Sequence, residues 1–443
     1  MSTKKFSEFT DELPITTEQK VLAYDEEAGK VIPRTLDELL NPAYGVEWDP
    51  IADTYTRFGR LAGYAAGTAT AAGAVVPEDI LPIQNGMFGC VVNDAGVMQY
   101  RLLSTNHTKK DSSDNISANI DGTDGQVMIR VPEHWFLQEY VGGKHRFWVS
   151  PYPIKGYHHF TGGYIGKYQA NLYDDGTSAY IDGDGIGGAD TVNDILGSIS
   201  GKKPWSNQTR AAFRTLAENR GTGWHQLDNR IYSAVVRLMV IEFATLNMQA
   251  AISEGNTKFA AWDFATCIGA TGKSNADGEV SNGQSTAGGN IGDYVSYRGI
   301  EDIFGNLYQF LDGMNVKNVE ADLASYLFLC NVHANYADDT ETNYTNCGEL
   351  ALLDGYGGNF IQLINDLGGM YPSAVGGSST TKLTDQFYTQ YDNLAPGYTT
   401  DWRVVRVGGC ADNGATAGVF CVAATDDSSI DLAHLGARLC LTL

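Results

Sequence analysis

Residues 182–190, with the sequence DGDGIGGAD, are the strongest candidate for metal chemistry in this chain. Their carboxylates alternate with glycines as in a calcium-binding loop, where oxygens converge on the ion and glycines turn the backbone. The bidentate glutamate that ends the full calcium motif is missing. We therefore favour a glycine-rich surface turn, keep calcium as the alternative, and predict no cofactor.

Histidine and cysteine residues give weaker signals for chemistry. The histidines at 134, 145, 158 and 159 stand among aromatic residues in strand-like sequence, which favours packing over metal binding. The seven cysteines form no C-x-x-C pair and show no metal-ligand spacing. An odd cysteine count without a secretory leader predicts folding in a reducing compartment with mostly buried thiols. The sequence contains no phosphate-binding loop, dinucleotide fingerprint or nucleophile elbow.

The composition narrows the class of protein. A chain of 443 residues is long enough for two or three domains. Hydrophobic residues make up 43% and charged residues 19%, with 51 glycines and 24 tyrosines, which is typical of a globular protein rich in strands and loops. The net charge of −23 argues against a nucleic-acid partner, which would need a basic face. We predict neither a signal peptide nor membrane insertion.

The elements that must position any site begin with two N-terminal regions. Residues 1–45 are polar, and one hairpin is predicted there, with its turn at 26–29. Such a segment cannot bury a core of its own, so we predict that it attaches the chain to another subunit or protein. Residues 46–125 are predicted to form a β-rich domain with a hairpin that turns at 93–96. A polar and glycine-rich cluster at 104–125 predicts the boundary that follows.

The remaining residues, 126–443, are predicted to form a larger domain that contains both strands and a helix. Two or three strands are expected at its start, with a turn at Gly142 and Gly143. The clearest helix is predicted to begin near Asp228, because apolar side chains recur after it at helical spacing. These side chains are Ile231, Ala234, Val235, Leu238, Met239, Ile241 and Phe243. The predicted fold class is therefore α+β.

Several blocks follow one another in this larger region. They are GYIGKYQA at residues 163–170, the predicted helix, RGIEDIFGNLYQFLDG at 298–313, WRVVRVGG at 402–409 and LGARL at 435–439. In this order they resemble the C-type-lectin-like fold in its formylglycine-generating-enzyme-like branch. The resemblance implies a C-type-lectin-like fold at the C-terminus, preceded by the β-rich N-terminal region.

Three physical roles are expected within these blocks. Gly305 and Asn306 permit a tight backbone turn. Arg438 is expected to tie the last strand to a buried carboxylate or to carbonyl groups. The apolar side chains after the turn should enter the core; these are Leu307, Phe310 and Leu311.

Residues 408–443 have an unusual composition. They contain no Lys, Glu, Gln, Met or Trp, the types that codons of the form NNC cannot encode. An Asn codon AAC with randomised adenines would yield only the remaining types. With its frame GG...NGA.AG.F........S......GARL, this window resembles the variable region of diversity-generating retroelement proteins, particularly those that serve as receptor-binding proteins on phage tails.

This second resemblance implies a non-enzymatic display protein, a phage tail fibre or tail-tip adhesin for host attachment. It would be made in the host cytoplasm, carried on the virion tail as a homotrimer, and joined to other tail proteins through residues 1–45. Its ligand would be a host cell-surface protein or glycan. The expected variable, ligand-binding positions are Cys410, Ala411, Asp412, Asn413, Thr416, Cys421, Ala423, Thr425, Asp426, Asp427, Ile430, Leu432 and His434.

Two other classes of protein stay open. An oxidase of the formylglycine-generating type needs a reactive cysteine pair near the terminal strand. Cys410 stands where one member is expected, but Ala415 lies near the other position. A purely structural tail protein is the second alternative, and it predicts that substitutions at Thr425, Asp426 and His434 leave host attachment unchanged.

Overall fold

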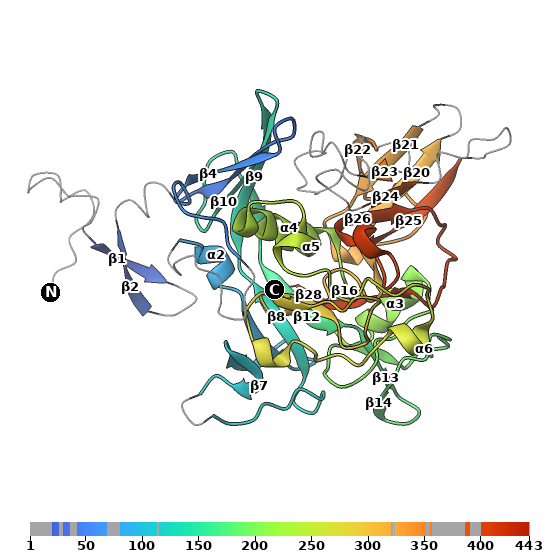
Figure 1. Ribbon diagram of the computed structural model, residues 1–443. Coiled ribbons are helices and arrows are strands. Elements are labelled where there is room, and N and C mark those ends of the chain that lie inside the picture. The colour runs from blue at the N-terminus through green and yellow to red at the C-terminus, as the bar shows by residue number, and fades with distance from the viewer. Residues whose placement is uncertain are drawn as a thin grey trace, which may run out of the picture.

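The computed structural model describes residues 20–25, 30–35, 42–68, 80–112, 115–319, 322, 324–350, 355–356, 386–389 and 400–442. These residues are mostly β-structure and include five α-helices, which confirms a β-rich α+β protein. Three large sheets carry the architecture. Figure 1 shows the helix α4 (Asn229–Phe243) near the centre, between them.

The N-terminal region contains the predicted hairpin. Strands β1 (Lys20–Asp25) and β2 (Lys30–Thr35) pair antiparallel along their whole length. The expected turn at 26–29 lies outside the described residues. Attachment of other proteins through residues 1–45 stays a prediction.

The first large sheet has five strands in the order β11-β9-β10-β3-β4. The predicted turn at Gly142 and Gly143 joins β9 to β10, and both glycines have positive φ, at 62° and 82°. Such angles suit glycine because it lacks a Cβ. The strands are β3 (Tyr44–Asp49), β4 (Thr54–Gly59), β9 (His134–Val141), β10 (Lys144–Ser150) and β11 (His158–Phe160).

The second large sheet has seven strands in the order β16-β28-β12-β8-β5-β6-β7. Its β5–β6 hairpin turns at residues 93–96, as predicted. The last strand of the chain, β28, lies between two others rather than at an edge. The strands are β5 (Phe88–Val92), β6 (Met98–Leu103), β7 (Asn106–Lys110), β8 (Gln126–Val131), β12 (Gly163–Gln169), β16 (Trp224–Gln226) and β28 (Arg438–Thr442).

The expected boundary at residue 125 falls inside these two sheets. Strand β3 pairs with β10, and β5 pairs with β8, so strands on both sides of residue 125 share hydrogen bonds. Strand β7 also lies within 104–125, where a break was expected. Residues 46–125 are therefore not a separate domain, because their strands complete sheets whose other strands come later in the chain.

The third large sheet contains the strands nearest the C-terminal window. Its order is β22-β21-β20-β25-β26-β24-β23, and β27 pairs with β20 in parallel. Strand β20 pairs with both β25 and β27, which brings three of the sequence blocks together, and β25 pairs with β26. The strands are β20 (Tyr308–Val319), β21 (Ala324–Leu329), β22 (Thr345–Glu349), β23 (Gly355–Tyr356), β24 (Gln386–Thr389), β25 (Asp401–Gly408), β26 (Gly418–Ala424) and β27 (Leu435–Gly436).

Shorter elements connect the large sheets. Two three-stranded sheets contain β13 (Asn171–Asp174), β14 (Ala179–Ile181) and β15 (Ile195–Gly197), and β17 (Asn282–Gln284), β18 (Tyr294–Tyr297) and β19 (Ile300–Glu301). The helices besides α4 are α2 (Pro82–Asn85), α3 (Arg210–Glu218), α5 (Met248–Ala251) and α6 (Phe264–Cys267). The 3₁₀ turns are η2 (Asn275–Asp277), η4 (His333–Asn335) and η6 (Gly414–Thr416).

Helix α4 begins as predicted, at an N-cap formed by Asp228. The Asp228 carboxylate accepts a hydrogen bond from the Ile231 backbone N–H at 2.9 Å, which satisfies one otherwise unpaired donor of the first turn. The sequence predicted one apolar face, but every residue of the helix except Arg230 is buried. The reason is that elements of the surrounding sheets cover the helix on more than one side.

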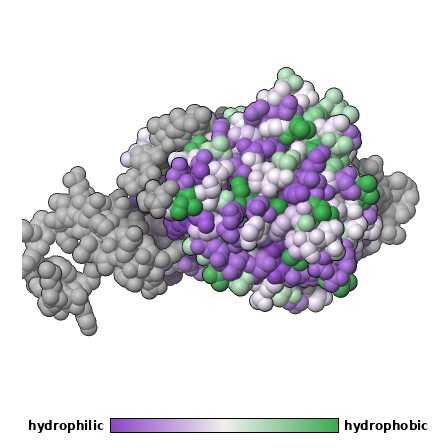
Figure 2. All heavy atoms as spheres, turned by 90° about the horizontal axis from the view of Figure 1, so that it is seen from below, coloured by the Kyte–Doolittle hydropathy of each residue, from purple (hydrophilic) through white to green (hydrophobic). Residues whose placement is uncertain are grey.

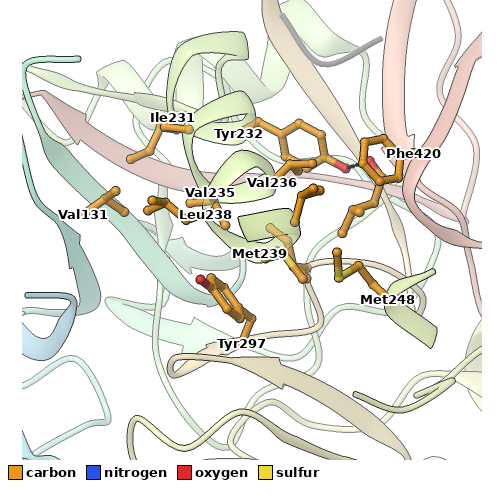
Figure 3. Packing of buried hydrophobic residues seen from close by; sticks show 14 of the residues in the cluster. Val131, Ile231, Tyr232, Val235, Val236, Leu238, Met239, Met248, Tyr297 and Phe420 are labelled. Atoms are coloured by element: carbon orange, nitrogen blue, oxygen red, sulfur yellow. Dashed lines mark hydrogen bonds between the residues drawn. The ribbon is translucent and has the colours of Figure 1, made fainter. Parts of the chain in front are cut away.

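Figure 3 shows this packing. On one side of α4, Val235 and Leu238 lie near Val131 of β8. On another side, the Tyr232 hydroxyl donates a 2.6 Å hydrogen bond to the Val419 carbonyl of β26. The helix therefore links the seven-stranded sheet to the strand that carries part of the C-terminal window.

None of the helices in the described ranges is long and apolar enough to span a membrane.

Figure 2 shows the face of the molecule on which β13 and β14 lie in Figure 1. Hydrophobic residues are scattered on it singly among hydrophilic ones, so this face offers no broad apolar patch.

Candidate ligand-binding surface

The frame of the C-terminal window is fixed by Arg438, whose side chain is fully buried. Its guanidinium ties β28 to β12, to β20 and to the turn after β19, and this confirms the expectation that carbonyl groups hold it. Burial lowers the pKa of Arg438 to about 10. The acceptors are Gln309 Oε1 at 2.7 Å, Gly166 O at 2.8 Å, Lys167 O at 3.1 Å, Glu301 O at 2.7 Å and Asp302 O at 2.8 Å.

The predicted tight turn at Gly305 and Asn306 is present, with φ angles of 73° and 62°. The Asn306 side chain donates to Gln169 Oε1 at 2.7 Å and accepts from Asn256 Nδ2 at 2.8 Å. The three apolar residues expected in the core are fully buried; they are Leu307, Phe310 and Leu311. Because Asn306 also accepts a hydrogen bond from the Ala411 N–H of the window, this turn holds the window in place.

Groups outside the window hold the backbone of residues 410–417. The Gln249 amide donates to the carbonyls of Gly414 and Ala417, at 2.9 and 2.7 Å. Ala411 donates its N–H to Asn306 O at 3.1 Å and accepts from Phe259 N at 2.9 Å. Because these contacts use backbone atoms of the window, its side chains can change without removing them.

The thirteen expected positions divide into two groups by burial. Four of them have small, buried side chains, which offer no surface to a macromolecule in this conformation; these are Cys410, Ala411, Cys421 and Ala423. They face the core because they pack beneath the window, in clusters with residues such as Phe264 and Leu307. The other nine are exposed or half-buried: Asp412, Asn413, Thr416, Thr425, Asp426, Asp427, Ile430, Leu432 and His434.

Fixed aromatic residues stand beside the variable candidates. The His434 ring lies 5.6 Å from the ring of Trp262 and 6.0 Å from that of Tyr308, between ring centroids. The Arg406 guanidinium lies 5.2 Å from the Tyr308 ring centroid, a cation–π geometry. The Tyr308 hydroxyl also lies 3.8 Å from the Cys421 sulfur. Together these contacts bring side chains from β20, β25, β26 and the loop before β27 to one place.

Arg406 also organises the polar part of this place. Its guanidinium pairs with the Asp426 carboxylate and donates to Thr425 Oγ1 at 3.2 Å. The Thr425 hydroxyl donates to Asp426 Oδ2 at 2.5 Å. Burial, with a smaller effect from Arg406, lowers the pKa of His434 to about 4, so its imidazole is neutral at pH 7.

We call this place the terminal surface: the nine exposed or half-buried candidates together with Trp262, Tyr308 and Arg406. Its outer part is the loop at residues 427–432. The Asp427 carboxylate accepts from Ser429 N at 2.8 Å, and the Ser428 hydroxyl donates to Asp339. Leu432 is 40% exposed, so the loop presents an apolar side chain within a largely polar rim.

The three fixed residues of the terminal surface were missed in the sequence. Tyr308 and Arg406 stand inside the blocks FGNLYQ and RVVRVGG, so their place beside the window was accessible from the resemblance. Trp262 gave no signal, because no pattern connects residues 256–264 with the window. Its position follows only from the folded chain.

The surroundings of Cys410 keep it a neutral thiol. Burial, assisted by the nearby Asp412 carboxylate, raises the pKa of Cys410 well above its usual value, and Cys410 Sγ lies 3.2 Å from Asp412 Oδ1. A reactive cysteine shows the opposite shift, because the thiolate is the nucleophile. All seven cysteines are free, and six of them are buried. These surroundings do not favour oxidase chemistry at Cys410.

The aspartates of residues 182–190 bind backbone N–H groups, two of them in their own turns. Asp182 accepts from Lys203 N at 2.9 Å, Asp184 from Ile186 N at 2.8 Å and Asp190 from Val192 N at 2.9 Å. These contacts are those of a surface turn. Within the ranges that the structure describes, no group of three or more His, Cys, Asp and Glu side chains could hold a metal ion.

The histidines at 134, 145 and 159 take part in packing. His159 stacks on Trp135 with 4.7 Å between ring centroids and lies 2.5 Å from Glu133 Oε1. His145 stacks on Trp48 at 5.4 Å. Buried His134 is 2.8 Å from the Pro132 carbonyl, and its burial lowers its pKa to about 3.

No protein-family model matches this chain, and a search of the curated proteins finds no match. Any function assigned to the terminal surface therefore depends on its own geometry and on the sequence resemblance.

Proposed function

We propose that this chain is a ligand-binding display protein whose C-terminal domain has a C-type-lectin-like fold and presents retroelement-diversified residues at the terminal surface. It would act as a phage tail fibre or tail-tip adhesin for host attachment. One observation carries the proposal: Thr425 and Asp426 contact Arg406, and His434 lies beside Trp262, in a window whose backbone other parts of the chain hold.

The division between fixed and changeable groups supports this use. Arg438, Gln249 and Asn306 bind carbonyl and amide groups, which are present whatever side chain the window carries. A rigid scaffold lowers the ordering cost of binding. Aromatic and arginine side chains are the types that most often contribute large binding energies. The terminal surface has such residues in the half-buried Trp262 and Arg406, and buried Tyr308 packs against Arg406.

The ligand would be a host cell-surface protein or glycan, and the chain would act as a homotrimer on the virion tail. Several copies acting together would strengthen weak individual contacts. Joining to other tail proteins would fall to residues 1–45.

Cell binding tests the terminal surface directly. We would measure adsorption of the fluorescently labelled protein to cells of the host strain, comparing the unchanged chain with the double variant Asp427→Ala, Leu432→Ala. Adsorption should fall at least about tenfold. Loss of one side chain that contributes strongly to binding weakens the binding free energy by about 1.4 kcal/mol or more, which is a factor of ten in the dissociation constant. The matched control is Ile51→Ala, Asp111→Ala, an exposed apolar and an exposed acidic residue in other loops. Equal loss in both double variants would contradict the proposal, and so would unchanged adsorption in the first.

The retroelement origin has a separate, genetic test. The DNA that encodes residues 408–443 should have a near-identical template copy nearby, with differences confined to adenines of the template, and a reverse transcriptase gene beside it. If the complete genome contained neither the template copy nor the reverse transcriptase gene, diversification would be refuted. Ligand binding by the terminal surface is tested separately, by the adsorption measurement.

A further inference from the structure

A pocket lies away from the terminal surface, where β13 and β14 reach the turn between β5 and β6. It has a volume of about 360 Å³, within the range of small-molecule sites. The residues important for its chemistry are Asp94, Asp124, Gln126, Tyr173, Tyr180 and Arg220.

Two tyrosine rings form one wall of this pocket. Tyr173 and Tyr180 face each other across the β13–β14 pair, with ring centroids 5.3 Å apart and planes at 75°. Two glycines hold the Tyr180 ring closely: a Cβ added at Gly122 would lie 2.3 Å from its Cε2, and one added at Gly197 would lie 2.4 Å from its Cε1. The Tyr180 ring is therefore fixed before any ligand arrives.

The polar groups of the pocket are fixed as well. Gln126, which is buried, donates from Nε2 to the Tyr180 hydroxyl at 2.9 Å and accepts from Ser198 N at 2.8 Å. Buried Arg220 donates to the same hydroxyl at 3.2 Å and to the Leu196 carbonyl at 2.7 Å. Because two donors converge on the Tyr180 oxygen, its own proton is left to donate to a ligand.

The charges of the pocket compensate one another. Arg220 Nη1 lies 2.5 Å from Asp94 Oδ1, and the Nζ of Lys110, a residue outside the pocket lining, lies 3.8 Å from Asp124 Oδ2. Asp124 also accepts from the Tyr100 hydroxyl at 2.8 Å, and that bond keeps the pKa of Asp124 low. With each charge beside an opposite one, the pocket has no excess charge with which to attract an ion. It does offer carboxylate, amide and hydroxyl groups beside aromatic rings.

We propose that this pocket binds a pyranose ring of a neutral glycan. Sugar hydroxyls both donate and accept, which matches the mixture of carboxylate oxygens with amide and phenol donors. The apolar face of a pyranose ring packs on an aromatic side chain, and the half-buried Tyr173 offers one. This site does not depend on the function proposed for the terminal surface, since the two share no residue.

The test is ligand-observed NMR with the full chain. The probes are methyl α-D-glucopyranoside, methyl α-D-galactopyranoside and methyl α-D-mannopyranoside, with tetramethylammonium chloride and sodium phosphate as ionic probes. At least one pyranoside should bind saturably, with a dissociation constant on the order of millimolar, as expected of so small a ligand. Failure of all three to bind, or binding by an ionic probe only, would overturn the proposal.

Variants locate the binding. Tyr173→Ala should weaken pyranoside binding at least tenfold, while Tyr173→Phe, which keeps the ring, should stay within threefold of the unchanged chain. Thr123→Arg places a long side chain at the exposed rim of the pocket, and it should also abolish binding without touching the core. Matched controls are Tyr140→Ala and Asp111→Arg, at an exposed tyrosine and an exposed aspartate elsewhere. Pyranoside binding that survives both Tyr173→Ala and Thr123→Arg would place the sugar elsewhere and overturn the proposal.

Discussion

Arg438→Met is the most informative single substitution for the frame of the terminal surface. Methionine keeps most of the length of the side chain but removes all five hydrogen bonds that Arg438 donates. Each buried acceptor left without a donor costs about 1–3 kcal/mol, so five acceptors set an upper limit of about 5–15 kcal/mol. Removing the buried charge also removes its desolvation cost, which offsets several kcal/mol of this loss. We expect a net loss of about 4–6 kcal/mol in the free energy of unfolding.

Urea denaturation followed by tryptophan fluorescence measures this loss. Buried Trp224 is a suitable reporter, because its strand β16 pairs directly with β28. The matched control is Arg146→Met: Arg146 pairs with Glu47 at 2.7 Å, but its side chain is 36% exposed. Such a surface pair contributes about 0–1 kcal/mol.

The reasoning is refuted if Arg438→Met costs no more than Arg146→Met. That result would mean that strand pairing alone holds β28, and that the buried hydrogen bonds of Arg438 add nothing. A loss near the expected size is a large part of the total stability of an ordinary domain, about 5–15 kcal/mol, so the urea concentration at the midpoint of unfolding should fall clearly.

Three further predictions concern the core, a buried ion pair and pH. Leu238→Ala, in the centre of α4, should lower the free energy of unfolding by about 2–5 kcal/mol in urea denaturation, and the exposed Val192→Ala should stay within about 0.5 kcal/mol. Arg214→Met should cost about 3–5 kcal/mol in the same measurement, because Arg214 pairs at 2.6 Å with fully buried Asp312; a loss no larger than that of Lys317→Met, at an exposed pair, would contradict this. His434 has a pKa of about 4 in the folded chain, below its usual 6.5, so protonation favours unfolding and stability falls as pH drops from 6.5 toward 4. His434→Gln should therefore lose less thermal stability than the unchanged chain between pH 7 and pH 5, and equal losses would show that His434 does not contribute.

Local features of the fold were predictable from the sequence. The helix start at Asp228, the hairpins at 93–96 and at Gly142 and Gly143, and the turn at Gly305 and Asn306 depend on residues close to one another in the chain. Side-chain preferences at caps and turns act over a few residues, so a single sequence carries them.

Contacts between distant strands were not predictable in this way. The pairing of β3 with β10 joins residues about 100 positions apart, and no residue pattern in either strand indicates which strand it pairs with. The buried charged residues of α4, Arg237 and Glu242, also gave no sign that the helix is covered around most of its surface. For the terminal surface, the window itself stood out by composition, whereas the place of Trp262 beside it depends on the whole fold.

The central position of β28 has a consequence for how the chain is made. Strands β12 and β16 both pair with β28, at residues 438–442. Because β16 ends at residue 226, β28 is synthesised more than two hundred residues after the two strands between which it lies. Until then, β12 and β16 expose unpaired edges during synthesis, and such edges invite aggregation. Nascent chains stalled before residue 438 should therefore need chaperones to stay dissolved, and full-length chains released from the ribosome should not.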